Sequence, residues 1–201
     1  KYAPLNPSDI SDLIVSAPFA WVVSGGEIIG ATPLPLRPHF DDAGKLIALI
    51  GHFARSNPQV ARLRENPRAM LLFMGPHGYI SPSWMTDRTQ APTWNYASAA
   101  FDCNLTFIDD AEGIEAVLRD LIEAMEAGRG KAWSLDEMGP RAKSLARGVV
   151  AFRADIREVQ PAFKLGQDER ADVYGDIIQA LAAGGEDALL VQMRAQNPGR
   201  G

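Results

Sequence analysis

The stretch Lys45-Leu46-Ile47-Ala48-Leu49-Ile50-Gly51-His52-Phe53-Ala54-Arg55-Ser56-Asn57-Pro58-Gln59 joins an apolar strand to the start of a helix. The strand is predicted from the aliphatic run over 45–50. Ser56 and Gln59 stand three residues apart, as in a capping box that starts a helix. We therefore expect the chain to turn here from a strand into a helix over about 57–65. The other segments form the scaffold around this corner.

The same corner predicts an anion-binding site. A helix start offers free N–H groups and a favourable dipole to negative charge. Arg55 stands beside it, and a guanidinium can add a two-pronged, charge-assisted bond. The alternative is that Arg55 pairs with a surface carboxylate and that His52 is a satisfied core histidine. These residues alone leave both interpretations open.

Short apolar segments on both sides of the corner have the composition of strands. We predict strands over 19–23, 27–32, 69–74, 79–81, 99–107 and 148–157, with hairpin turns at Gly25-Gly26 and Gly75-Pro76-His77-Gly78. Thr32–Pro38 carries a proline at nearly every second place, which predicts an edge strand or an extended segment. Cys103 falls at a buried position of the alternating strand and is expected to act as a small hydrophobic residue.

Helical periodicity and capping residues mark the remaining elements. They predict helices over about 9–15, 111–125, 134–147, 169–182 and 186–195. Several short strands, few of them separated by crossover helices, predict an α+β fold: a mostly antiparallel β-barrel with peripheral helices. We expect one domain over 1–201, with a helical segment at about 109–147 and a helical C-terminal extension at about 168–195.

Charge and hydropathy argue against some classes of function. The formal net charge of the 201 residues is −5, which does not support a large electrostatic footprint for DNA, although local basic patches remain possible. Arg62, Arg64 and Arg68 form one such group and Arg141, Lys143 and Arg147 another; ordinary solvated faces explain both equally simply. No apolar run approaches the length of a membrane span and no secretory signal is evident, so we expect a cytoplasmic protein without membrane contact.

The chain lacks the sequence motifs of several common kinds of binding and catalytic site. Neither the dinucleotide fingerprint G-x-G-x-x-G nor the P-loop is present. The three histidines, His39, His52 and His77, lie on separate segments, so we predict no metal site. Ser81 and Ser83 lack the setting of a nucleophile elbow. No residue identifies itself as a catalytic acid or base, and enzymatic activity is left undecided.

A second polar and aromatic cluster suits a planar heterocycle. It comprises Tyr79-Ile80-Ser81-Pro82-Ser83-Trp84 and Pro92-Thr93-Trp94-Asn95-Tyr96. We expect Trp84, Trp94 and Tyr96 on strands, where aromatic residues are by themselves more often core than cofactor contacts. Asn95 between two aromatic residues favours a ligand, because a buried amide needs partners and a flavin ring edge offers donors and acceptors.

At these residues the chain resembles the PaiB-type family of FMN-binding negative transcriptional regulators, which have a flavin-reductase-like split barrel. The resemblance covers most of the chain and rests on four motifs in the family order. They are Gly51–Gln59, Tyr79–Trp84, Pro92–Tyr96 and Phe163-Lys164-Leu165-Gly166-Gln167.

The resemblance implies a homodimer of split barrels with FMN bound where the subunits meet. It places Arg55 on the phosphate, and Trp84 and Trp94 over the ring. It further implies that Lys164 and Gln167 close the site from the other side. The remaining cofactor-binding residues that it implies are His52, Asn57, Ser81, Ser83, Thr93 and Asn95, among which Ser81, Ser83 and Asn95 would bond phosphate, ribityl or ring edge.

Some positions depart from the family pattern. Pro33 and the segment Ala97–Phe101 stand where the family usually has histidines, and Met85 stands where a tyrosine is common. Gly166 and Asp168 replace a serine and an asparagine. The cofactor site is therefore either intact or weakened. For function, the resemblance implies a transcriptional regulator or flavin-dependent sensor; the alternative is a flavin-dependent oxidoreductase acting on a small molecule, in which the cofactor does the redox work.

Overall fold

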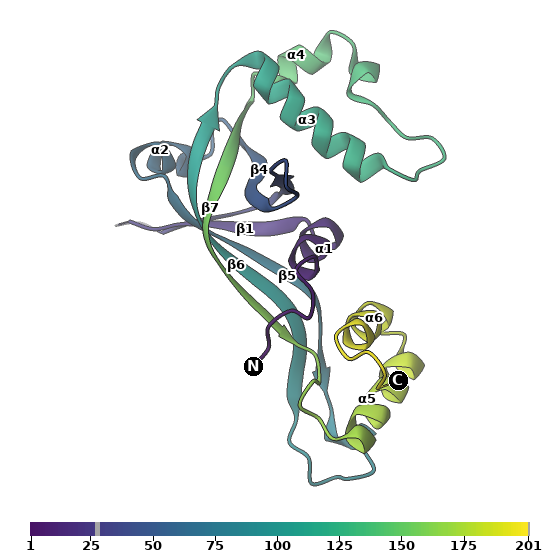
Figure 1. Ribbon diagram of the computed structural model, residues 1–201. Helices are drawn as coiled ribbons and strands as arrows, with labels where there is room; N and C mark the ends of the chain where they lie inside the picture. Colours follow the sequence, from purple (N-terminus) through teal and green to yellow (C-terminus); the bar gives the residue numbers. More distant parts are fainter. Residues whose placement is uncertain (27–28, 201) are drawn as a thin grey trace. The chain divides into compact units, whose positions relative to one another are not determined.

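The structure is a computed structural model that describes residues 1–26 and 29–200. Its strands are β1 (Phe19–Ser24), β2 (Gly30–Pro35), β3 (Arg37–Phe40), β4 (Leu46–Ala54), β5 (Arg68–Ile80), β6 (Thr93–Ile108) and β7 (Val149–Lys164). Its helices are α1 (Asp9–Ser16), α2 (Pro58–Glu65), α3 (Ala111–Glu126), α4 (Arg141–Ala146), α5 (Ala171–Gly184) and α6 (Asp187–Ala195), with the 3₁₀ turns η1 (Pro82–Trp84) and η2 (Leu135–Met138). The predicted α+β class is confirmed (Figure 1).

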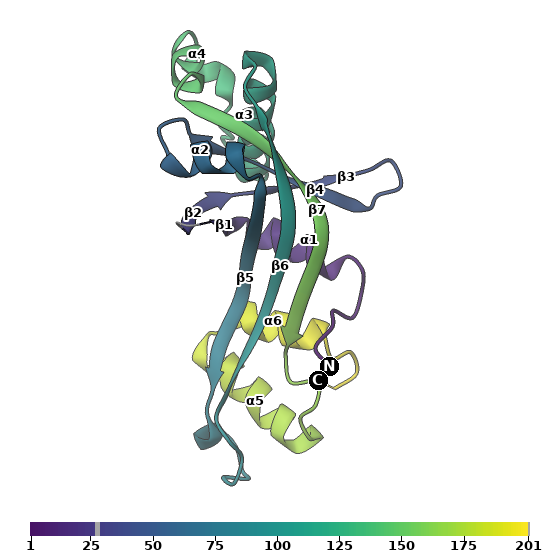
Figure 2. The same ribbon diagram turned by 90° about the vertical axis from the view of Figure 1, so that its left-hand side faces the viewer.

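The strands form one sheet in the order β2-β1-β5-β6-β7-β4-β3. The pairs β1–β2, β1–β5, β3–β4 and β4–β7 are all antiparallel. β5, β6 and β7 run side by side along much of their length (Figures 1 and 2). The strands are longer than the short ones expected, since β6 and β7 have 16 residues each.

The chain divides into two compact units, one made of three separate segments of the sequence and the other of two. Unit 1 comprises Lys1–Ala17, Met74–Ala99 and Gln160–Gly201. Unit 2 comprises Pro18–Phe73 and Ala100–Val159, two longer segments that contain β1 to β4, α2, α3 and α4. The two units are described separately below.

The proline-rich segment lies at the edge of the sheet, as predicted. β2 is the first strand in the sheet order, and it carries Pro33 and Pro35 opposite β1. Proline cannot donate to the next strand, so an edge is where it is tolerated. The predicted hairpin between β1 and β2 is confirmed, with Phe19 paired to Pro35 and Ser24 to Gly30. Of that prediction, Glu27 and Ile28 lie outside the described residues.

The predicted hairpin turn at 75–78 is wrong. β5 continues through Gly75, Pro76 and His77 to Ile80 as one strand of 13 residues. The register of β1 with β5 covers Ala69 to Leu72, and Pro76 lies beyond it. A proline there does not have to donate a hydrogen bond to β1, so it does not end the strand.

The alternating segment behaves as its pattern predicts. β6 buries every second residue from Asn95 to Leu105, with polar or half-buried residues between them. Cys103 lies on the buried face, and burial raises the pKa of its thiol to about 12. It is therefore an inert core residue, as expected.

Five of the six predicted helices are found close to their expected bounds. α3 begins after Asp110, whose carboxylate accepts the Gly113 N–H at 2.7 Å. The single helix expected over 134–147 is instead divided into η2 and α4. Gly139 between them has φ 55°, which glycine adopts without strain, and Pro140 follows, so a helical ladder cannot pass this point.

Aromatic contacts hold the core of unit 2. The Phe53 ring lies 5.1 Å from that of Phe152, and the Phe73 ring meets that of Phe101 edge-on at 5.6 Å. In unit 1 the buried Tyr174 hydroxyl of α5 donates to the Met193 carbonyl of α6 at 3.2 Å. Each unit thus has its own core.

Candidate functional site

The start of α2 is capped one residue later than predicted. Asn57 is the N-cap: its Oδ1 accepts the Gln59 N–H at 2.9 Å. Asn57 Nδ2 also donates to Thr32 Oγ1 of β2 at 3.0 Å. The capping box of Ser56 and Gln59 is therefore wrong, because Asn57 already caps the helix and Ser56 remains exposed.

Gln59 has a different task, which the sequence did not reveal. It is 2% exposed, and its Nε2 lies 2.9 Å from the Val22 carbonyl of β1 and 3.2 Å from the Gly30 carbonyl of β2. Its Oε1 accepts the Thr32 hydroxyl at 2.6 Å. In the sequence, the glycine at position 30 is the one hint of this close contact. In the structure, a Cβ there would lie 3.0 Å from Gln59 Cγ. Gln59 fastens α2 to the β1–β2 hairpin.

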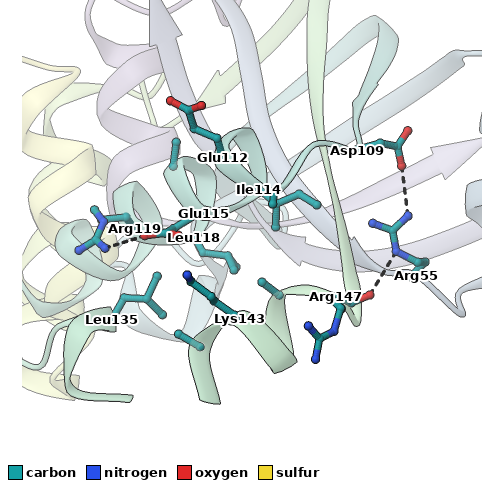
Figure 3. A pocket seen from close by; sticks show the side chains of 14 residues that line it. Arg55, Asp109, Glu112, Ile114, Glu115, Leu118, Arg119, Leu135, Lys143 and Arg147 are labelled. Carbon is teal, nitrogen blue, oxygen red and sulfur yellow. Dashed lines mark hydrogen bonds and ion pairs between the residues drawn. The ribbon is translucent and has the colours of Figure 1, made fainter. Parts of the chain in front are cut away.

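Arg55 is engaged with protein groups. Its Nη1 donates to Asp109 at 3.1 Å (Figure 3). Its Nη2 donates to the Val149 carbonyl at 2.9 Å. Nε donates to the Arg147 carbonyl at 3.3 Å. The surface-carboxylate alternative thus describes this structure. The side chain is still 43% exposed, so a phosphate could share or displace these bonds.

Asp109 is shared between two arginines, which the sequence did not indicate. Arg64 Nη2 donates to both of its carboxylate oxygens, at 2.7 and 2.9 Å. The hydrogen bond from Arg64 and, after it, the bond from Arg55 lower the pKa of Asp109. Because Arg64 alone can neutralise this carboxylate, Arg55 can be released without leaving Asp109 unpaired.

His52 is half-buried on β4, next to the corner. Its Nδ1 is buried and has no hydrogen-bond partner among the described residues. Burial lowers the pKa of the imidazole, so the neutral form is favoured. His52 is therefore not the satisfied core histidine of the alternative interpretation.

The serines of unit 1 present an exposed pair of hydroxyls. Ser81 Oγ and Ser83 Oγ lie 2.7 Å apart, and Ser81 Oγ also accepts the Ser83 N–H at 3.2 Å. Trp84 follows in η1, so its expected position on a strand is wrong. Ser81 caps the turn and Pro82 starts it, which ends the strand before Trp84.

Trp94 lies on the exposed face of β6 in unit 1. The side chain is 52% exposed, and its ring lies 6.3 Å from that of Tyr79 and 5.7 Å from that of His77. This group is an open aromatic surface of the kind that a planar ring can cover.

Asn95 points away from that surface. It is 1% exposed, in contrast to its neighbour Trp94, because successive side chains of a strand face opposite sides. Its Nδ2 contacts Met193 Sδ of α6 at 3.5 Å, and its Oδ1 is buried with no partner among the described residues. The structure therefore brings Trp94 to the surface and Asn95 into the core.

The last motif, residues 163–167, forms the end of β7 and the loop that follows it. Lys164 Nζ donates to Thr93 Oγ1, which brings two of the predicted residues together. Gln167 instead holds its own loop: Oε1 accepts the Leu165 N–H at 2.8 Å and Nε2 donates to the Phe163 carbonyl. Gly166 between them has φ 82°, so a serine at this position would be strained.

The predicted site residues thus fall into two sets. His52, Arg55 and Asn57 belong to unit 2, and the other eight belong to unit 1. Asn95 is buried in the core and Gln167 bonds its own loop, while several of the other residues keep accessible groups. Unit 2 offers an accessible guanidinium, and unit 1 offers exposed hydroxyls, an ammonium group and an open aromatic surface. These groups suit the phosphate, the polar chain and the ring of a flavin mononucleotide respectively.

Two other kinds of site were sought. Residues 1–26 and 29–200 hold no cluster of three or more His, Cys, Asp or Glu side chains placed to bind a metal ion. Within the same ranges, no helix has the length and apolar character needed to cross a membrane.

Comparison with known proteins defines the class to which this fold and these residues belong. The family described as "Putative FMN-binding domain" matches residues 1–158, and the chain belongs to that family. The chain is also 31% identical over 179 residues to "Protease synthase and sporulation protein PAI 2" of Bacillus subtilis (strain 168), covering 88% of this chain and 84% of that protein. The resemblance to the PaiB type is thereby confirmed.

Solved structures confirm the split-barrel fold. The flavocytochrome Anf3 of Azotobacter vinelandii matches 81% of this chain and 70% of its own, with a TM-score of 0.61 at 14% identity. The FAD and heme binding protein of Mycobacterium smegmatis matches 90% of this chain and 78% of its own, with a TM-score of 0.59 at 18% identity.

Proposed function

We propose that this chain binds FMN and acts as a PaiB-type transcriptional regulator or flavin-dependent sensor. The observation that carries the proposal is the exposed aromatic surface of Trp94 and Tyr79, in a chain whose family is defined by FMN binding. The name of the Bacillus relative refers to protease synthesis and sporulation, which supports a regulatory role. With a formal net charge of −5, this role is better served by a protein partner than by direct DNA contact.

The residues of the chain would bind and orient the cofactor, whose ring supplies the redox chemistry. Arg55 provides charge for the phosphate, with Asn57 and His52 nearby in sequence. In unit 1, Lys164 and Thr93 form a bonded pair that can turn toward a ligand, and the Ser81 and Ser83 hydroxyls can bond the ribityl chain. Trp94 and Trp84 provide apolar cover for the ring.

A homodimer with the cofactor at the subunit interface belongs to the same proposal. In unit 2, Phe19, Trp21 and Leu72 are exposed on neighbouring strands, with Trp21 paired directly opposite Leu72. In unit 1, Met74 and Trp94 are more than half exposed. Apolar side chains gathered on a sheet face mark protein interfaces, so both faces suit a second copy of this chain.

The oxidoreductase alternative is favoured by one observation. His77 is exposed, and its ring lies 5.7 Å from that of Trp94. It is a titratable side chain beside the expected ring surface and could move a proton during flavin reduction. Turnover of NADH or NADPH with bound FMN, and its loss in His77→Gln, would support the enzyme over the regulator.

The cofactor proposal is tested by titrating the purified protein with FMN and following flavin fluorescence. We expect Arg55→Ala to weaken binding by about 1.5–3 kcal/mol, the usual loss for a charged hydrogen bond. Asp109→Asn should bind FMN at least as tightly as the parent, because it releases Arg55. A protein that takes up no FMN contradicts the proposal, and unchanged affinity in Arg55→Ala removes Arg55 from the site.

A further inference from the structure

Unit 2 contains a cavity of about 930 Å³ between α3, η2 and α4 (Figure 3). Its apolar lining comes from Ala111, Ile114, Ala116, Leu118, Leu135, Ala142 and Ala146. A volume of this size is typical of small-molecule sites. The cavity exists because α4 is short and, on α3, Ile114 is the one fully buried residue, so the apolar side of α3 is incompletely covered.

Only two kinds of side chain line the cavity. Every side chain that lines the cavity is either alanine, isoleucine or leucine, or is charged. Over the described part of the chain, the lining includes no aromatic ring, hydroxyl or amide. A flavin ring would leave its polar edge without partners here, which costs free energy. A plain hydrocarbon chain has no such groups to satisfy.

Some of the charged side chains at the rim of the cavity form ion pairs and others do not. Arg55 is paired with Asp109, and Arg119 is paired with Glu115 and Asp136. Lys143, Arg147 and Glu112 also line the cavity, and none of the three forms an ion pair with a described residue. In Figure 3 Lys143 extends from α4 in among the lining side chains, between Leu135 and Leu118 in this view.

The spacing of these two cations adds to the argument. Lys143 lies on α4, and Arg147, four positions later, is the C-cap residue of that helix. Like charges at this spacing repel one another. Two unpaired cations against one unpaired carboxylate leave the lining with an excess of positive charge, which a bound anion would compensate. Their interpretation as an ordinary solvated face does not explain the cavity.

We propose that this cavity binds a small aliphatic carboxylate, with the carboxylate held by Lys143 and Arg147 and the hydrocarbon chain packed along Ile114, Leu118 and Leu135. Arg55, which is proposed to bind the FMN phosphate, also lines this cavity, so the two proposed sites are neighbours in unit 2. The carboxylate site itself uses Lys143 and Arg147 and does not require bound FMN. Burial of the chain supplies most of the affinity, and the two cations select the anionic head group.

Isothermal titration calorimetry of the full chain with decanoate, kept below its micelle concentration, tests the proposal. We expect saturable binding of one decanoate per chain. The double variant Lys143→Gln/Arg147→Gln should lose at least about tenfold in affinity, or about 1.4 kcal/mol. Decanol, which has the same chain without the charge, should bind the parent and the double variant equally.

Two further variants control for indirect effects. Arg141→Gln removes a cation from the same exposed helix but outside the cavity lining, and should leave decanoate binding unchanged. Ala146→Phe fills the cavity and should abolish binding. Circular dichroism checks that each variant is folded, and Ala142→Phe replaces Ala146→Phe if the latter fails this check.

Three results would overturn the proposal. The first is the absence of saturable decanoate binding, and the second is equal affinity in the parent and the double glutamine variant. The third is stoichiometric displacement of decanoate by FMN, which would make the cavity part of the flavin site. Failure of the protein to bind FMN affects none of these measurements.

Discussion

Gln59 is a polar residue in the core of unit 2, and its buried side chain bonds both strands of the β1–β2 hairpin. A buried amide that satisfies several partners at once specifies one arrangement of the elements that it joins. Replacing it removes a donor from the Val22 and Gly30 carbonyls and the acceptor of the Thr32 hydroxyl, in a site that water cannot easily reach.

We expect Gln59→Ala to lower the free energy of unfolding by about 1–3 kcal/mol, the cost of unsatisfied buried polar groups. Urea denaturation followed by circular dichroism measures the change. Glu65→Ala, an exposed change at the other end of the same helix, is the matched control and should have little effect. Equal stability of the two variants would show that the Gln59 network contributes nothing net.

Cys103 gives a prediction about pH. Burial, and secondarily the charges of Asp102 and Asp155, raise the pKa of the thiol from 9.0 to about 12. A thiol reagent at about pH 8 should therefore react with Cys103 only after denaturation, since the thiolate is the nucleophile. Between these two pKa values the unfolded chain binds fewer protons than the folded one, so this group's contribution to stability falls as the pH rises above about 9.

Cys103→Ala separates this effect from other alkaline titrations. The parent should lose stability between about pH 9 and about pH 10 more steeply than the variant, as measured by urea denaturation. Identical pH dependence in both proteins, or rapid modification of the native thiol, would be inconsistent with a buried Cys103.

At the scale of elements, α1 packs closely on β5 at a glycine. A Cβ on Gly75 would lie 2.4 Å from Leu13 Cδ1 and 3.3 Å from the Ala97 carbonyl oxygen. The helix can therefore approach the strand only because residue 75 has no side chain. The same glycine lies in the segment that looked like a turn.

Gly75→Ala should lower the free energy of unfolding by about 1–3 kcal/mol, the usual cost of overpacking, because Leu13 and α1 must move. Gly130→Ala introduces the same methyl group in open space and serves as the control. Thermal or urea denaturation compares them. A Gly75→Ala protein as stable as the control would show that α1 shifts without cost.

Most elements of this fold could be predicted because their patterns are local. The alternation of β6, the caps of α3 and the prolines of β2 each act through neighbouring residues. The turn expected at Pro76 was wrong because its outcome depends on where β1 stops pairing, which is a long-range property. The cap of α2 was assigned to Ser56 because two adjacent residues both suit the role, and only tertiary contacts favour Asn57.

The sequence was enough to predict which types of residue form the candidate site, but not how these residues are arranged in space. The sequence identified Arg55 and Trp94, whose chemistry is evident from their side chains. It did not reveal that Arg64 shares Asp109 with Arg55, or that Asn95 lies on the buried face of β6. These facts depend on contacts between segments far apart in the chain.

At the scale of the whole molecule, the proposed dimer can be tested on each unit separately. Trp21 is 51% exposed in unit 2 and Trp94 is 52% exposed in unit 1. A lysine at either position would place a charge in the proposed interface, which is costly without a partner. Size-exclusion chromatography with light scattering should show a dimer for the parent and monomer for Trp21→Lys and Trp94→Lys.

Trp133→Lys is the matched control, because Trp133 is an exposed tryptophan that precedes η2, away from the strands. It should remain dimeric. A monomeric parent protein, or dimers in all three variants, would contradict the proposed interface.

The segments of the two units alternate along the chain, which limits how the gene could be divided between them. The chain crosses from one unit to the other four times, and the family match ends at residue 158, before the last segment of unit 1 begins at Gln160. No single uninterrupted length of gene therefore encodes either unit. A single contiguous piece of the gene therefore cannot carry one whole unit into another protein without also carrying part of the other.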